Sequence, residues 1–184
     1  MATQAQIKVE RSARIISPKA RASYPTLFVP RAFNETTEPK FSITLMVQKN
    51  AVGQAFIDQI ERAQADAVKA IWGDKPPKNL EVWGVADGDE DKDSAMAGHW
   101  LVKASNKIRP AVVDLDRQQI LDESEVYGGC YVRASICAKA YGTSSKGGVT
   151  LELVAVQKLE DGEPFGGAEK AKAQAVDEFA DSDM

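Results

Sequence analysis

The feature that most constrains the fold is a strict two-residue alternation between Tyr131 and Tyr141, where the chain runs YVRASICAKAY. Successive side chains of a β-strand point to opposite faces. The alternation therefore predicts a strand with one small apolar face and one face of aromatic and cationic groups. That outer face suits a polyanion with stackable bases, or it is an ordinary solvated sheet face. The apolar set is Val132, Ala134, Ile136, Ala138 and Ala140, and the outer set is Tyr131, Arg133, Ser135, Cys137, Lys139 and Tyr141.

A single helix is predicted over 51–72, because apolar residues recur there at helical spacing. Asn50 is a suitable N-cap, and Gly73 followed by Pro76 and Pro77 ends the helix. The apolar stripe consists of Phe56, Ile60, Ala63, Ala67 and Ile71.

Short strands are predicted on both sides of this helix, at 7–16, 21–28, 40–47, 99–106, 111–114, 131–141 and 149–158. With only one helix, a parallel α/β sheet is excluded, because its crossovers need several helices. The pattern favours a mainly β fold, an OB-fold five-stranded antiparallel Greek-key barrel with additional strands and one inserted α-helix. We expect one OB-fold domain over 1–167 and a flexible acidic tail over 168–184. Within the domain we expect a long polar loop at about 74–98, in which Leu80, Val82, Trp83 and Val85 favour a short strand.

Net charge is distributed unevenly along the chain. The total is −4, and residues 177–184 carry four acids and no base, so the other 176 residues sum to zero. Residues 1–50 hold eight Lys or Arg against three Glu. A mobile anionic tail can occupy a cationic groove and compete with DNA, in a salt-dependent way. The tail residues concerned are Asp177, Glu178, Phe179, Asp181 and Asp183.

Several classes of protein are excluded by what the sequence lacks. No apolar run approaches the roughly 20 residues that span a bilayer, and the N-terminus has no signal-peptide block, so we expect a cytoplasmic protein without membrane contact. Cys130 and Cys137 are expected as free thiols. With one histidine, His99, and an acidic run at 87–93 that departs from the EF-hand pattern, we expect no metal and no cofactor. No nucleophile or acid–base motif is present, so we expect no enzyme.

Basic and aromatic residues recur together outside the 131–141 strand as well. Cations meet phosphates and rings stack on bases of any sequence, so these residues are candidates for a nucleic-acid surface. The candidate DNA-binding residues are Arg21, Tyr24, Arg31, Phe33, Lys103, Lys107, Arg109, Tyr131, Arg133, Lys139 and Tyr141.

Four stretches in order resemble a family of phage single-stranded DNA-binding proteins of OB fold, first grouped as a family of unknown function. They are ARASYPTLFVPRAFNETTEPKFSITLMV, AGHWLVKASNKIRPAVVD, YGGCYVRASICAKAYG, and DGEPFGG followed by DEFAD. The resemblance covers the chain from about residue 18 onward. It implies a protein that coats single-stranded DNA in phage replication and recombination, in the cytoplasm of the infected host.

Related replication-type phage proteins use an acidic, aromatic-tipped C-terminus to contact polymerase and helicase. This sequence departs from them, because Phe179 is not the terminal residue. The resemblance implies no individual DNA contacts. A homodimer is compatible with the sequence. Two alternatives stay open: a structural or protein-interaction module of a phage replisome or virion without DNA binding, and a nuclease that uses the acidic loop.

Overall fold

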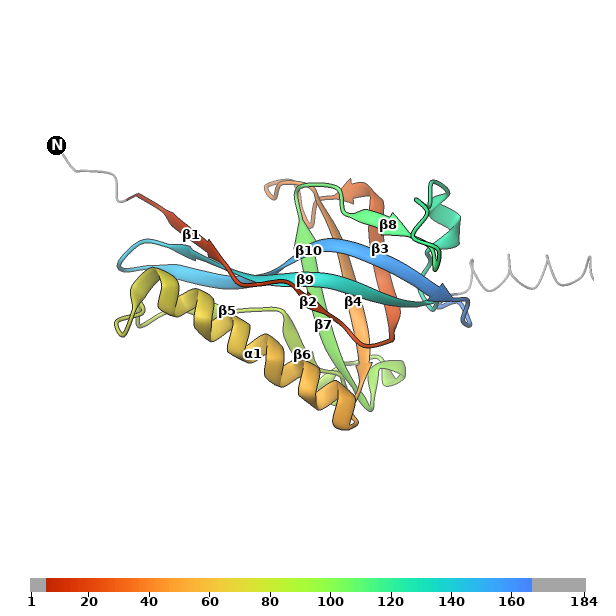
Figure 1. Cartoon of the computed structure of the whole chain (residues 1–184), viewed down its shortest axis with the longest axis horizontal. Helices are drawn as coiled ribbons and strands as arrows, with labels where there is room; N and C mark the ends of the chain where they lie inside the picture. Colours follow the sequence, from red (N-terminus) through yellow and green to blue (C-terminus); the bar gives the residue numbers. More distant parts are fainter. Residues whose placement is uncertain (1–5, 167–184) are drawn as a thin grey trace, which may run out of the picture.

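The computed structural model describes residues 6–166. The predicted tail over 168–184, with its acids and Phe179, lies outside the described residues. Five long strands, several short ones and one long helix make up the fold (Figure 1). The strands are β1 (Lys8–Arg11), β2 (Ile15–Ile16), β3 (Ala20–Arg31), β4 (Lys40–Gln48), β5 (Glu81–Val82), β6 (Val85–Asp87), β7 (His99–Asn106), β8 (Ala111–Val113), β9 (Tyr131–Gly142) and β10 (Gly147–Glu160). The helices are α1 (Ala51–Trp72) and the 3-10 turns η1 (Gly88–Glu90), η2 (Ser94–Met96) and η3 (Glu123–Glu125).

The five long strands close into a barrel. Their order is β9–β3–β4–β7–β10, and β10 returns to β9. All these pairs are antiparallel except β7 with β10, which run parallel where Ser105 faces Glu152. This is the Greek-key closure of an OB fold, so the predicted fold class is confirmed. The short strands extend the wall: β1 and β2 pair with β9, β5 and β8 with β10, and β6 with β7.

The core lies inside the barrel and beneath α1. The predicted inner face of β9 is buried in full, from Val132 to Ala140 at alternate positions. On β4 the alternating residues from Phe41 to Val47 are buried in the same way. The period-two pattern is therefore confirmed on both strands, because each has one face in the core. One member of the predicted outer face of β9, Cys137, is nevertheless buried as well.

Helix α1 follows β4 and packs against β9, β1 and β10 (Figure 1). Asn50 caps it by accepting a hydrogen bond from the Gly53 amide at 2.8 Å, and Gly73 ends it with a φ of +58°. These are the predicted bounds. At its C-terminal end, Trp72 Nε1 donates to the Thr143 carbonyl at 2.8 Å, which holds the tip of the β9–β10 hairpin against the helix.

Two predicted segments differ in detail from the structure. The 7–16 strand is divided into β1 and β2, and the short strand expected in the 74–98 loop is divided into β5 and β6, which are followed by two 3-10 turns. Strand β3 is longer than predicted and pairs on both edges, with a register shift between Ser23 and Thr26 that accommodates Pro25. Proline has no amide hydrogen to donate, so within a paired strand it requires such a bulge. In the part of the chain that the structure describes, no helix is long and apolar enough to cross a membrane.

Candidate nucleic-acid interface

Four half-buried hydroxyl residues lie side by side on β3, β4 and β7. Thr26 faces Ser42 and Ser42 faces Ser105 across these strands, and the next position on β4, Thr44, faces Lys103 on β7. The Thr26 and Ser42 hydroxyls lie 2.9 Å apart in a hydrogen bond. We name these four residues, Thr26, Ser42, Thr44 and Ser105, the hydroxyl floor. Short side chains there let an extended ligand approach the sheet closely.

Cations border the hydroxyl floor. Lys103 stands within it and is exposed, and Arg31 and Lys40 face one another at the end of the β3–β4 pair. None of the three side chains has an ion-pair partner among residues 6–166. Two more predicted cations lie nearby with partners: Lys107 pairs with Glu38, and Arg109 lies 5.3 Å from the ring centroid of Phe28.

Two exposed aromatic residues come from the same strand pair, Tyr24 from β3 and Phe33 from the β3–β4 loop. Tyr24 is 78% exposed and Phe33 is 90% exposed. Tyr24 occupies the β3 bulge with a φ of +46°, a conformation that costs a residue with a side chain about 1–2 kcal/mol. A strained, solvent-exposed tyrosine indicates a functional role, because burial of the ring does not repay the strain.

Arg21 is engaged within the protein. Its Nε donates to the Gly129 carbonyl at 3.1 Å, another guanidinium nitrogen donates to the Glu163 carbonyl, and the group lies 4.0 Å from the Phe165 ring centroid. It therefore fastens residues 161–166 to β3. Its predicted role as a phosphate contact stays a prediction.

The outer face of β9 is the second predicted set, and its cations have partners. Lys139 lies 3.6 Å from Glu152, which also receives a hydrogen bond from Arg11 at 2.8 Å. Arg133 donates to Gln157 at 2.6 Å.

Glu152 is the centre of this cluster. Burial acts to raise its pKa, but the hydrogen bond from Arg11 and the charges of Arg11 and Lys139 hold the pKa below its ordinary value. At the other end of β9, the Lys19 ammonium lies 4.7 Å from the Tyr131 ring centroid. The DNA-binding role of the β9 residues stays a prediction.

Apart from Arg21, the predicted DNA-binding residues fall into two groups. The first is the β3–β4–β7 face, which we define as the hydroxyl floor with Lys103, Lys107, Arg109, Arg31 and Lys40, and with Tyr24 and Phe33. The second is the outer face of β9. Lys40 was not among the predicted contacts, although it begins the alternating strand whose outer positions are Ser42 and Thr44.

Among the described residues there is no group of three or more His, Cys, Asp or Glu side chains that could hold a metal ion. In the acidic loop, Lys49 pairs with both Asp87 and Asp89, the latter at 2.6 Å. Its hydrogen bonds hold the pKa of both carboxyls below the ordinary value. Cys130 and Cys137 are buried free thiols, and burial raises the pKa of each.

A protein-family model described as the ssDNA-binding protein of Enterobacter phage Enc34 matches residues 13–184. The chain belongs to this family. The Enc34 single-stranded DNA-binding protein, solved in complex with ssDNA, is 28% identical to the chain with a TM-score of 0.70, over 83% of this chain and 89% of that one. A C-terminal truncation of the same Enc34 protein is 30% identical with a TM-score of 0.66, over 83% and 88% of the two chains.

Two further proteins are similar to the chain. "Putative protein p50" of Acyrthosiphon pisum secondary endosymbiont phage 1 is 28% identical over 173 residues, 89% of this chain and 91% of its own length. The single-stranded DNA-binding protein gp2.5 of bacteriophage T7 has a TM-score of 0.61 over 80% of this chain and 91% of that one. At 18% identity, gp2.5 shows a shared fold alone.

Proposed function

We propose that this protein binds single-stranded DNA without sequence preference and protects it during phage replication and recombination. The observation that carries the proposal is the β3–β4–β7 face. There exposed rings, and cations of which Lys103, Arg31 and Lys40 have no ion-pair partner among residues 6–166, border a floor of small hydroxyl residues. Membership of a family named for ssDNA binding supports the same conclusion.

Each part of this face has a distinct role. Lys103, Arg31 and Lys40 neutralise phosphates, which releases counterions and makes affinity fall with salt. Tyr24 and Phe33 stack on bases, and stacking tolerates every base because each has a π-face. The OB fold uses its second and third strands for such ligands, which here are β4 and β7.

The proposed role is binding without catalysis, in the cytoplasm of the infected host. The acidic residues 177–184 compete with DNA for the cationic face and contact replication proteins such as polymerase and helicase when DNA displaces them. A homodimer is compatible with this role. These statements about tail, partners and assembly rest on the sequence.

The test is a titration of the full chain with oligo-dT of about 16 nucleotides and with duplex of equal length, at several salt concentrations. We expect tighter binding of oligo-dT. We also expect Lys103→Ala to make the slope of log K against log salt shallower by about 0.7, one phosphate contact on a single strand.

Lys69→Ala is the control for Lys103→Ala, because Lys69 is an exposed lysine on α1. Its slope should match that of the wild type. Equal affinity for single strand and duplex would contradict the proposal. So would the absence of binding to either, which would favour a protein-interaction module.

A further inference from the structure

The ring of Trp83 lies against the backbone of Gly148, next to the ring of Tyr141. A Cβ at Gly148 would come within 2.8 Å of both Trp83 Cζ3 and Tyr141 Oη. Glycine is required there because any side chain would displace the two rings. Trp83 is nevertheless 47% exposed, so its ring is supported on one side and open to solvent on the other.

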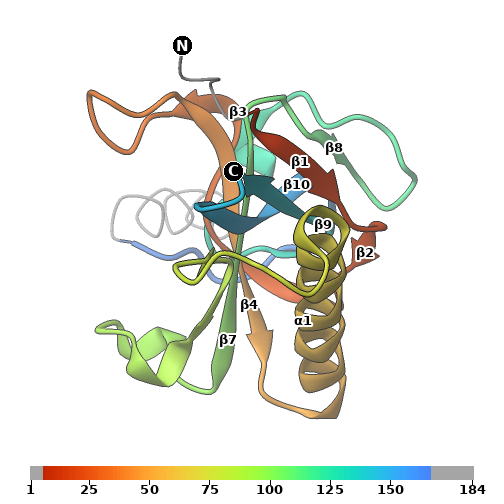
Figure 2. The same cartoon turned by 90° about the vertical axis from the view of Figure 1, so that its left-hand side faces the viewer.

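The two rings lie on the face of the β9–β10 hairpin that is turned away from α1. Gly147 and Gly148 are consecutive in β10 and so present opposite faces. A Cβ at Gly147 would meet Trp72 of α1, whereas one at Gly148 would meet Trp83 and Tyr141. Figure 2 looks onto the tip of this hairpin, with α1 on one side and the β3–β4 loop on the other.

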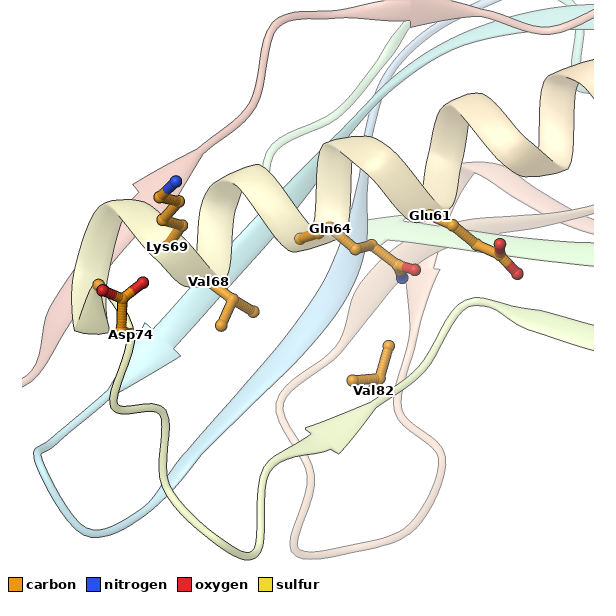
Figure 3. Close-up of a pocket in the computed structure, with 8 residues that line it drawn as sticks. Glu61, Gln64, Val68, Lys69, Asp74 and Val82 are labelled. Atoms are coloured by element: carbon orange, nitrogen blue, oxygen red, sulfur yellow. The ribbon is translucent and has the colours of Figure 1, made fainter.

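The backbone around Trp83 is fixed by three hydrogen bonds. Its amide donates to the Val149 carbonyl at 2.9 Å, and its carbonyl accepts from Gln64 Nε2 at 2.9 Å. Gln64 is a buried polar residue of α1, and Figure 3 shows it extending toward the segment that carries Val82. The amide of Lys103 donates to the Gly84 carbonyl at 2.7 Å. Because its backbone is held in this way, Trp83 loses little conformational entropy when a ligand stacks on its ring.

The hydrogen bond between the Lys103 amide and the Gly84 carbonyl joins the segment of Trp83 to the β3–β4–β7 face. Gly84 follows Trp83 in the chain, and Lys103 lies within the hydroxyl floor.

The surroundings carry charges of both signs. Glu81 is paired with Gly148 and acts on Tyr141, whereas Arg11 and Lys139 share the single carboxylate of Glu152. Lys139 lies two residues from Tyr141 on the same face of β9, and exposed Lys146 lies at the hairpin tip with no ion-pair partner among residues 6–166.

We propose that Trp83 and Tyr141 form a second base-stacking site for single-stranded DNA, at the hairpin end of the β3–β4–β7 face. The inference rests on the proposed function and extends it. The strand runs from Phe33 past Lys103 to the hairpin, and an unpaired base stacks on the open face of Trp83. Burial and the neighbouring charge of Glu81 raise the pKa of Tyr141, so its hydroxyl stays neutral at physiological pH.

The opposite side of β5 gives a matched control. Val82 lies beside Trp83 in sequence and is 56% exposed, but it lines an open pocket of about 430 Å³ against α1 (Figure 3). The charged groups that line this pocket are two carboxylates, Glu61 and Asp74, and one ammonium, Lys69. The net negative charge of this lining would repel the phosphates of a DNA strand.

The experiment measures oligo-dT binding by anisotropy and, separately, the quenching of tryptophan fluorescence. We expect Trp83→Ala to weaken binding of an oligo-dT of about 16 nucleotides by about 5- to 150-fold, the range for loss of one stacked base. Val82→Ala should bind like the wild type. Trp83→Phe should keep most of the affinity and lose most of the DNA-dependent quenching, since Trp72 and Trp100 are only partly exposed and pack on the core.

Thermal unfolding of each variant shows whether it is folded. If Trp83→Ala binds oligo-dT like the wild type, or Trp83→Phe retains the full quenching, the second stacking site is wrong. The proposed function would still stand if Lys103→Ala reduces the salt dependence in the same assay. Loss of binding to a replication protein with unchanged oligo-dT affinity would identify a protein-docking surface and overturn the inference.

Discussion

Arg31 and Lys40 are direct partners across the β3–β4 pair, and no acid is paired with either among residues 6–166. Like charges that face one another in a sheet destabilise it. The two cations lie at the two ends of the exposed β3–β4 loop, which contains Phe33. An anion bound between the two cations would relieve the repulsion, which a phosphate of a DNA strand can do.

Replacing one of these cations by an acid should raise the stability of the fold and lower the affinity for DNA. Lys40→Glu creates an opposite-charge pair with Arg31, so the free energy of unfolding should rise by about 0.2–1 kcal/mol. Affinity for oligo-dT should fall, and its salt slope should become shallower by at least about 0.7. Lys40→Gln is the control that removes the charge alone. An unchanged affinity of Lys40→Glu for oligo-dT would show that no DNA phosphate binds between Arg31 and Lys40.

A substitution at the strained Tyr24 should likewise change thermal stability and affinity for DNA in different ways. Asparagine tolerates a positive φ better than tyrosine does, so Tyr24→Asn should leave the midpoint of thermal unfolding unchanged or raise it. The same variant should lose about 1–3 kcal/mol of binding free energy for oligo-dT, because a stacking ring is removed. Calorimetry and anisotropy check the two effects. A lower midpoint of thermal unfolding with unchanged affinity for oligo-dT would show that the Tyr24 ring stabilises the fold and does not stack on DNA.

Glu152 makes stability depend on pH. Its folded-state pKa lies below the ordinary value of about 4.3, so its stabilisation is present above that value and is lost as pH falls through the folded pKa. Glu152→Gln should therefore lower the free energy of unfolding at pH 7 by about 1–3 kcal/mol, and the difference should shrink below about pH 4. Glu160→Gln, which removes an exposed pair with Lys19, should have a small effect at every pH.

Glu152→Gln also tests the β9 face. The substitution releases Arg11 and Lys139 from their shared carboxylate, so affinity for oligo-dT should rise at low salt if these cations reach DNA. Anisotropy at two salt concentrations measures this. An unchanged affinity would show that Arg11 and Lys139 do not contact DNA.

Deletion of residues 177–184 should raise affinity for oligo-dT, most at low salt, because it removes four of the acids that compete for the cationic face. A chain of full length with these acids replaced by their amides controls for length. If the deleted chain binds as tightly as the full chain, or more weakly, the tail does not compete with DNA.

The sequence alone determined the bounds of the helix and the core faces of β4 and β9. Alternation in 40–47 and 131–141 predicted which side chains enter the core, and Asn50 and Gly73 predicted the ends of α1. Each of these signals is local, because side-chain period and capping depend on residues a few positions apart. The balance of strands to helices was enough to predict an OB barrel.

Only the tertiary structure decided which predicted contacts remain available to a ligand. Lys103 and Lys139 look equivalent in the sequence, yet Lys139 meets Glu152 whereas Lys103 meets no acid among residues 6–166. Trp83 lay in a segment predicted as loop, and its support by Gly148 depends on a contact between residues 65 positions apart in the chain. Residues brought together by barrel closure leave no periodic pattern in a sequence, which is why the faces of the strands were predictable and the ion-pair partners of the cations were not.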